Sequence, residues 1–312
     1  MAFETNLAVL KTILEEGSIL WPQEEQRKVS GEDARRANHG IWNRAIARFQ
    51  QIPLWEGEVP GWKPEEDQPA PNLIFFPSGS ETPGGTVIVS HGGAFFMRAG
   101  HEGFHTARRF LEFGFNVAVL TYRLAPYSRM DALADIQRAV RVLRARKEEL
   151  GITDKIAVLG FSAGGMLSAN CATHYDAGCP EAEDPIARQS CRPDAAVICY
   201  GAFAGSSYPG KIFEDPFADE NRRERVYLAA EKNITVDTPP FFIWQTISDD
   251  PRHGMALAKE LTDCGVPFEL HFFPDGHHGV GMGDGYNDGF ENFPHLSRWA
   301  QLCAEWLQMQ GI

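Results

Sequence analysis

The stretch Lys155-Ile-Ala-Val-Leu-Gly160-Phe-Ser162-Ala-Gly164-Gly165 joins an apolar run to a Gly-x-Ser-x-Gly motif, and a helix-forming segment, 166–174, follows it. The apolar run predicts a strand buried on both faces. A Gly-x-Ser-x-Gly motif between a strand and a helix is typical of a sharp turn that exposes a nucleophilic serine, and small neighbours are needed because the turn is tight. We therefore expect Ser162 to act as a nucleophile. The amide of Ala163, at the start of the helix, is expected to face developing negative charge.

The pattern around this motif predicts the fold class. From residue 72 onward, short apolar runs alternate with amphipathic segments, which predicts an α/β fold with a mostly parallel sheet and helices on both faces. The predicted strands are 72–76, 86–90, 117–121, 156–160, 195–200, 241–246 and 269–273. Predicted helices cover 131–150, with Asp131 as a cap, 255–264 and 296–309.

The first fifty residues have a different pattern. Segments 7–14 and 41–49 show helical periodicity without any strand signal, and a Pro-rich connector follows at 53–71. We predict an N-terminal helical extension over residues 1–51 and a catalytic domain over 52–312. Whether the extension caps the site or packs on the back of the sheet stays open. The segment 214–238 is too long for a plain connection and is expected to supply pocket walls.

A second glycine motif ends an earlier strand. His91-Gly92-Gly93-Ala94-Phe95 follows the predicted strand 86–90 and matches the loop type that supplies backbone donors to a substrate oxyanion. Glycines are needed there because backbone amides must approach the oxygen without side-chain obstruction. We expect the amides of Gly92 and Gly93 to join that of Ala163 as donors.

Candidates for the acid and the base follow the later strands. Asp249 and Asp250 come after the run 241–246, and His277 and His278 come after the run 269–273. The order serine, carboxylate, histidine at strand ends is the one expected for a nucleophilic serine in this fold. An imidazole suits the task of taking and returning the serine proton, while the carboxylate fixes its tautomer. The residues themselves leave both pairs ambiguous by one position.

Together these motifs resemble the acetylesterase and xylan-esterase-like branch of the α/β-hydrolases, related to the hormone-sensitive-lipase-like carboxylesterases. The resemblance extends over about 52–307 and includes Tyr122-Arg-Leu-Ala-Pro126 and Gly265-Val-Pro-Phe-Glu-Leu-His271 besides the motifs above. In that family the acid directly precedes a proline and the base directly precedes a glycine, which implies Asp250 and His278. The resemblance also implies a small acyl group, such as acetyl, on a carbohydrate or similar alcohol, and no cofactor.

Three further residues near these motifs are expected to contact the substrate. They are Phe95, Phe161 and His277. His101-Glu102-Gly103-Phe104-His105 matches the zinc-peptidase string His-Glu-x-x-His, but Gly103 interrupts the helix and no third ligand is evident, so we predict no metal. The alternatives are a serine peptidase of the prolyl-oligopeptidase-like type, a metallopeptidase and a non-catalytic binding protein with this fold.

Composition restricts the partners. The 312-residue chain has a formal net charge of −13 and a pI near 5.2, which disfavours nucleic acid and anionic lipid as partners. The start lacks a basic segment followed by an apolar run, and no stretch is long enough to span a bilayer, so we expect a cytoplasmic protein without membrane contact. Six cysteines without paired spacing are expected to be free thiols. A homo-oligomer remains possible on this sequence.

Overall fold

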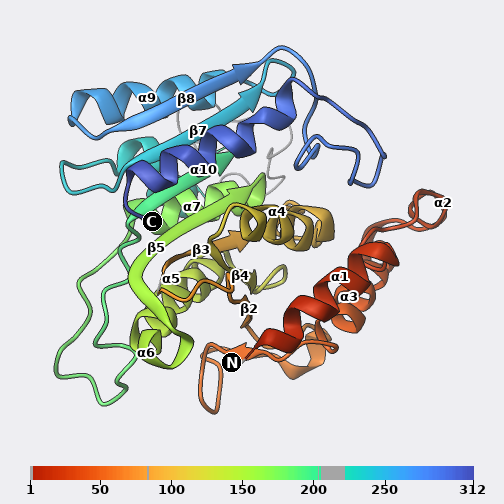
Figure 1. Ribbon diagram of the computed structural model, residues 1–312, viewed down its shortest axis with the longest axis horizontal. Helices are drawn as coiled ribbons and strands as arrows, with labels where there is room; N and C mark the ends of the chain where they lie inside the picture. The colour runs from red at the N-terminus through yellow and green to blue at the C-terminus, as the bar shows by residue number, and fades with distance from the viewer. Residues whose placement is uncertain (1–2, 83, 203, 205–221) are drawn as a thin grey trace.

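The computed structural model describes residues 3–82, 84–202, 204 and 222–312. An eight-stranded sheet in the order β1-β2-β4-β3-β5-β6-β7-β8 forms its centre (Figure 1). Strand β2 pairs antiparallel with both of its neighbours, β1 and β4. All other neighbouring strands pair parallel. The predicted α/β class, with an extension of helices before the sheet, is confirmed.

The strands lie close to the predicted positions. Their bounds are β1 Ile52–Pro53, β2 Asn72–Phe76, β3 Gly84–Ser90, β4 Asn116–Thr121, β5 Ile152–Phe161, β6 Ala195–Cys199, β7 Phe241–Thr246 and β8 Phe268–Phe273. Strands β2 to β7 are almost entirely buried, because helices cover both faces of the sheet. The two-residue strand β1 at the edge was not predicted.

Alternate residues of the strands feed two separate cores. Val87, Val119 and Leu159 point to the face covered by α1 (Glu4–Glu15), α3 (Gly31–Ile46), α4 (Thr106–Glu112) and α10 (Trp299–Met309). Ile88 and Val158 point to the face covered by α5 (Arg129–Ala145), α7 (Ala163–Thr173) and α9 (Arg252–Asp263). This division follows from the two-residue period of a strand.

The shorter helices fill the connections. These are α2 Gln23–Gln26, η1 Pro64–Glu66, the π-helix η2 His101–His105, α6 Lys147–Leu150, α8 Arg222–Tyr227, η4 Ala230–Lys232 and η5 Leu296–Arg298. Helix α5 begins earlier than predicted: Ser128 is its N-cap, and Asp131 serves as the reciprocal partner of that cap. Of the segment 214–238 expected to supply pocket walls, residues 214–221 lie outside the described residues.

The N-terminal helices lie against the face of the sheet that also carries α4 (Figure 1). Leu10 and Ile13 of α1 and Trp42 of α3 are buried in that core. Within the described ranges, every helix falls short of the length and apolar character that crossing a bilayer requires.

Parallel pairing brings the carboxyl ends of β3, β5, β7 and β8 to one edge of the sheet. Ser90 at the end of β3 is in register with Gly160 near the end of β5, and Thr246 of β7 is in register with Phe273 of β8. The segments that follow these strands carry the glycine loop, Ser162, the aspartate pair and the histidine pair. They therefore meet at this edge, where open α/β sheets form their sites.

Candidate active site

Ser162 occupies a strained turn between β5 and α7. Its backbone has φ 52° and ψ −116°, a conformation that a residue with a side chain rarely adopts. The turn is possible only because its neighbours are small: a Cβ on Gly160 would lie 1.9 Å from the carbonyl oxygen of Gly164. The side chain of Ser162 is thereby held at the sheet edge, where it is 5% exposed and lines a pocket.

His278 contacts Ser162 directly. A hydrogen bond of 2.7 Å joins the Oγ of Ser162 to the Nε2 of His278, and the Nδ1 of His278 lies 3.0 Å and 2.9 Å from the two carboxylate oxygens of Asp249. Burial lowers the pKa of His278, but the hydrogen bond and charge of Asp249, with the charge of Glu102, outweigh burial and raise it above the ordinary histidine value. The arrangement joins a hydroxyl, an imidazole and a carboxylate in sequence.

The carboxylate against the imidazole is not the predicted one. Asp250 forms an ion pair with Arg252, with 2.7 Å between its Oδ1 and the arginine Nε, and this pairing lowers the pKa of Asp250. Asp249 is 8% exposed and its amide donates to the Thr246 carbonyl, so the turn after β7 directs its side chain inward. The prediction that Asp250 contacts the imidazole was therefore wrong. Its position before a proline does not determine which side chain reaches His278.

One predicted oxyanion donor is engaged elsewhere. The Gly92 amide donates to the Oε2 of Glu102 over 2.6 Å, so it is directed into the protein and the prediction for Gly92 needs correction. Gly93 has φ 118°, which favours glycine, and lines the pocket. Ala163 is the first residue of α7, where amides have no acceptor within their own helix. Gly93 and Ala163 remain candidate donors.

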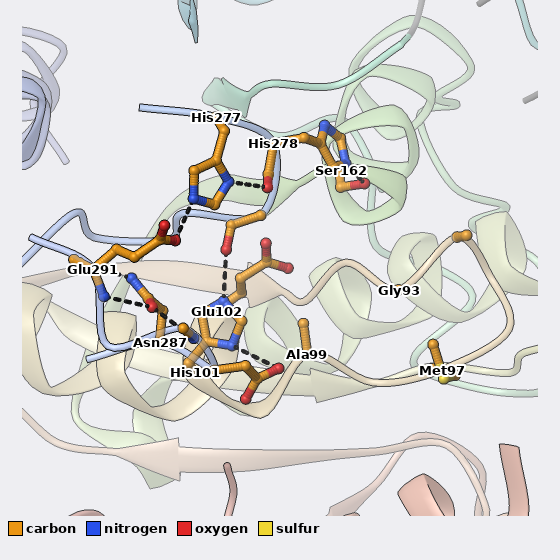
Figure 2. Close-up of a pocket in the computed structure, with 14 residues that line it drawn as sticks. Gly93, Met97, Ala99, His101, Glu102, Ser162, His277, His278, Asn287 and Glu291 are labelled. Carbon is orange, nitrogen blue, oxygen red and sulfur yellow. Dashed lines mark hydrogen bonds and ion pairs between the residues drawn. The ribbon is translucent and has the colours of Figure 1, made fainter. Parts of the chain in front are cut away.

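A pocket lies beside Ser162, and Figure 2 shows the residues that line it. Its volume is about 450 Å³. Polar side chains of residues 277–291 form one wall. Small or apolar residues form the other wall, and they come from 91–95, the glycine loop predicted to bind an oxyanion and called the oxyanion loop below, and from the segment after it. The described lining residues are Gly93, Ala94, Met97, Ala99, His101, Glu102, Ser162, His277, His278, Gly279, Asn287, Asp288, Gly289 and Glu291. A cavity of this size with one polar and one mainly apolar wall fits a small organic ligand.

The expected substrate contacts are met in part. His277 lines the pocket and turns away from Ser162 toward Glu291, with which it forms a short contact (Figure 2). Burial lowers the pKa of His277, but its hydrogen bonds to the His278 carbonyl and to Glu291 leave it raised. Phe161 is completely buried between Tyr200 and Trp299, so its prediction as a substrate contact was wrong.

Phe95 also departs from its predicted role. It is buried with its ring edge against Tyr122, 6.1 Å between centroids, and it is not among the described residues that line the pocket. Its neighbour Ala94, with φ 55°, lines the pocket instead. The aromatic residue after the glycine loop therefore supports the loop from behind.

The residue that sequence reasoning missed is Glu102. It lies inside the His-Glu-x-x-His string, between the two histidines that resemble metal ligands. His101 contacts the Gly279 carbonyl over 3.0 Å, and His105 contacts Asp284 over 2.9 Å. Glu102 itself lines the pocket and is 2% exposed. The local sequence carries no signal for its contact with Gly92, because that contact depends on the loop folding back over ten residues. Among the described residues, no group of three or more His, Cys, Asp or Glu side chains is arranged to hold a metal ion.

Comparison with known proteins finds ester hydrolases with a similar sequence and fold. The family model described as BD-FAE matches residues 73–204. An acetyl ester-xyloside bifunctional hydrolase from Caldicellulosiruptor lactoaceticus is 32% identical with a TM-score of 0.76, and the match covers 84% of this chain and 96% of that one. The carboxylesterase Cest-2923 from Lactobacillus plantarum WCFS1 is 22% identical with a TM-score of 0.63, covering 77% and 92%, which bears on the fold alone.

Two curated relatives are longer than this chain. Endo-1,4-beta-xylanase B of Butyrivibrio fibrisolvens is 28% identical over 296 residues, which cover 89% of this chain and 44% of that protein. An acetylxylan esterase of Xylanibacter ruminicola is 23% identical over 257 residues, which cover 75% of this chain and 48% of that protein. The chain thus spans a little under half the length of the curated relatives it matches.

Proposed function

Because this chain belongs to the α/β-hydrolase family of esterases, we propose that it hydrolyses carboxylic esters through an acyl-enzyme formed on Ser162. The observation that carries the proposal is the 2.7 Å hydrogen bond between Ser162 and an imidazole whose other nitrogen contacts Asp249. A serine hydroxyl is a weak nucleophile until an adjacent base can accept its proton. The hydrogen bond between His278 and Ser162 supports the imidazole as that base.

In the proposed first step, the Oγ of Ser162 attacks the ester carbonyl while its proton passes to the Nε2 of His278. Asp249 accepts a hydrogen bond from the Nδ1–H group of His278 and stabilises the imidazolium that forms. The carbonyl oxygen becomes an oxyanion, for which the amides of Gly93 and Ala163 are the proposed donors. One such donor contributes on the order of 10²–10³ in rate.

The tetrahedral intermediate then collapses. The carbon–oxygen bond to the alcohol breaks, and His278 returns the proton to the leaving oxygen. A water molecule attacks the acyl-enzyme by the same route in reverse roles: its proton goes to His278, and Ser162 leaves with that proton. The products are the carboxylic acid and the free enzyme.

The proposed substrate is a short-chain ester, an acetyl ester, of a carbohydrate alcohol. The two named relatives with acetyl ester or acetylxylan in their descriptions support the acyl group. The wall that includes His277, Asp288 and Glu291 supports a hydroxyl-rich alcohol, since each of these side chains can form hydrogen bonds. Rates on acetylated xylo-oligosaccharides against those on aryl acetates and longer aryl esters test this choice.

The mechanism is tested with Ser162→Ala. A fluorophosphonate probe should label the wild type once, at Ser162, and the variant should lose both labelling and hydrolysis of an aryl acetate. Ser168→Ala, in the same helix α7, is the matched control and should keep both. Labelling or full hydrolysis by a folded Ser162→Ala variant would overturn the proposal.

A further inference from the structure

A buried carboxylate that the proposed mechanism does not use lies beside the site. Glu102 is 2% exposed, and both of its oxygens are engaged: Oε2 accepts from the Gly92 amide and Oε1 accepts from the Tyr200 hydroxyl, each over 2.6 Å. Burying a carboxylate is costly unless hydrogen bonds compensate it. These bonds connect the π-helix η2 with the loop after β3 and the residue after β6.

Tyr200 extends this connection to the loop that carries the imidazole. Its hydroxyl accepts from the amide of Gly281, three residues after His278, over 2.9 Å. Its ring packs edge-on against the His278 ring with centroids 5.2 Å apart. A continuous chain of hydrogen bonds therefore runs from Gly92 through Glu102 and Tyr200 to Gly281.

The contact with Gly92 also determines how the oxyanion loop is built. Oε2 of Glu102 occupies the space next to Gly92, where an added Cβ would lie 2.5 Å from it and 2.9 Å from the Cβ of Ser162. The Gly92 amide is directed to this oxygen, and it is the next residue, Gly93, that lines the pocket. The carboxylate thus fixes one side of the turn whose other side faces the substrate.

Several ionisable groups lie near Glu102. Its charge acts on Tyr122, Cys199, Tyr200 and His278, and His101 is its neighbour in η2. Burial, followed by the charge of Glu102, raises the pKa of Tyr200 well above its ordinary value, so its hydroxyl stays a donor. His278 is the group whose protonation changes during the proposed reaction.

We propose that Glu102 is a positioning residue of the hydrolytic site, which holds the Gly92–Gly93 turn and, through Tyr200, the loop of His278. Its negative charge also favours the imidazolium formed when Ser162 loses its proton. This inference rests on the proposed function. Figure 2 shows Glu102 beside His101 among the residues that line the pocket.

The decisive variant is Glu102→Gln, which keeps the size of the side chain but removes its charge and one acceptor. We expect kcat to fall at least about 10-fold with a smaller change in KM, since the contacts act on the transition state. The acidic limb of the pH profile should move to lower pH, because the imidazolium loses a nearby negative charge. Glu112→Gln, an exposed residue of α4, is the control and should change neither.

A second variant keeps the proposal testable if Glu102→Gln does not fold. Tyr200→Phe leaves the carboxylate and its bond to Gly92 in place and removes the hydroxyl that bonds both Glu102 and the Gly281 amide, so kcat should fall about threefold or more. Rates are expressed per site that a fluorophosphonate probe can titrate. Stoichiometric labelling of Ser162 together with unchanged kcat and pH profile in the folded variant would overturn the role of Glu102 while leaving the esterase mechanism standing. If the probe fails to label Ser162 in the wild type, the esterase mechanism itself is overturned.

Discussion

At the scale of single residues, the two carboxylates after β7 have opposite surroundings. Asp249 is buried against the imidazole of His278, whereas Asp250 is paired with Arg252 at the surface. Only the first can orient the imidazole and stabilise its charged form. The neighbours therefore offer a matched pair of variants with the same chemical change.

We predict that Asp249→Asn lowers kcat about 10³–10⁴-fold, because an amide at this position favours the wrong tautomer of the imidazole. Asp250→Asn should stay within about threefold of the wild type, since it alters a surface ion pair that contributes little. Steady-state hydrolysis of an aryl acetate, with active sites titrated, measures both. A larger loss in the Asp250 variant would reassign the acid.

The pH dependence follows from His278. The imidazole must be neutral to accept the Ser162 proton, so activity is present above its pKa and is lost as the pH falls through that pKa. Asp249 and Glu102 together raise this pKa against the lowering effect of burial. We therefore expect the acidic limb of kcat/KM above pH about 6.5, the ordinary histidine value. In Asp249→Asn the limb should move to lower pH; a limb that does not move would contradict the assignment.

The contacts that the sequence predicted and those that it did not predict differ in how local their determinants are. Ser162 and His278 stand in motifs whose glycines act on adjacent backbone, so short-range patterns were sufficient to predict that they meet. The partner of the imidazole depends on which of two side chains the turn after β7 directs inward. The partner of the Gly92 amide depends on a loop closing over ten residues. Neither is encoded in a short motif.

At the scale of elements, the turn between β5 and α7 leaves no space for a side chain at its glycines. A Cβ on Gly164 would lie 2.2 Å from the Ser90 carbonyl oxygen and 2.5 Å from that of His91. Both contacts are with backbone of β3 and its following loop, which cannot move without opening the sheet. The close approach of α7 to β3 thus requires glycine at this position.

We predict that Gly164→Ala destabilises the protein by about 3 kcal/mol or more, as overpacking against backbone does. The control is Gly40→Ala in α3, where the nearest atom is a flexible guanidinium nitrogen of Arg44 at 3.3 Å. An alanine there should stabilise the helix by about 0.5–1 kcal/mol. Urea unfolding of the two variants decides the matter, and equal stability of both would refute the packing argument.

Helices and strands could be predicted from the sequence where their buried residues form an apolar run or recur at a regular spacing. Six of the eight strands are buried runs of apolar residues, and these were located within a few residues of their bounds. Strand β1 has two residues and no pattern. Helix α3 was expected only from residue 41, because its first turns are largely charged and its buried side there includes the polar Asn38 and His39.

At the scale of the whole molecule, the N-terminal helices support the site from behind. Asn38 of α3 exchanges two hydrogen bonds with the backbone of Arg98, of 2.9 Å and 2.7 Å, in the segment that follows the oxyanion loop. The Tyr286 hydroxyl donates to the Leu14 carbonyl, and the Trp21 amide donates to Asp288 in the pocket wall. The position of the N-terminal segment, which the sequence left open, is therefore against the back of both loops.

The contribution of the N-terminal helices to stability can be measured at Trp42 of α3. It is 2% exposed, packs its ring against His91 (4.8 Å between centroids) and Phe104 (5.1 Å), and donates to the Thr121 hydroxyl over 3.2 Å. Burial lowers the pKa of His91 to about 3, so it stays neutral and acts as part of this packing. We predict that Trp42→Ala costs about 3–5 kcal/mol of stability.

The same variant should also lower kcat per titrated site, because His91 directly precedes Gly92 and loses the ring that holds it. Val236→Ala, at a residue 78% exposed, is the control and should change stability by less than about 0.5 kcal/mol. Urea unfolding and aryl acetate hydrolysis measure the two effects on one preparation. A Trp42→Ala protein that is destabilised but keeps the full kcat would show that the N-terminal helices stabilise the sheet without shaping the oxyanion loop.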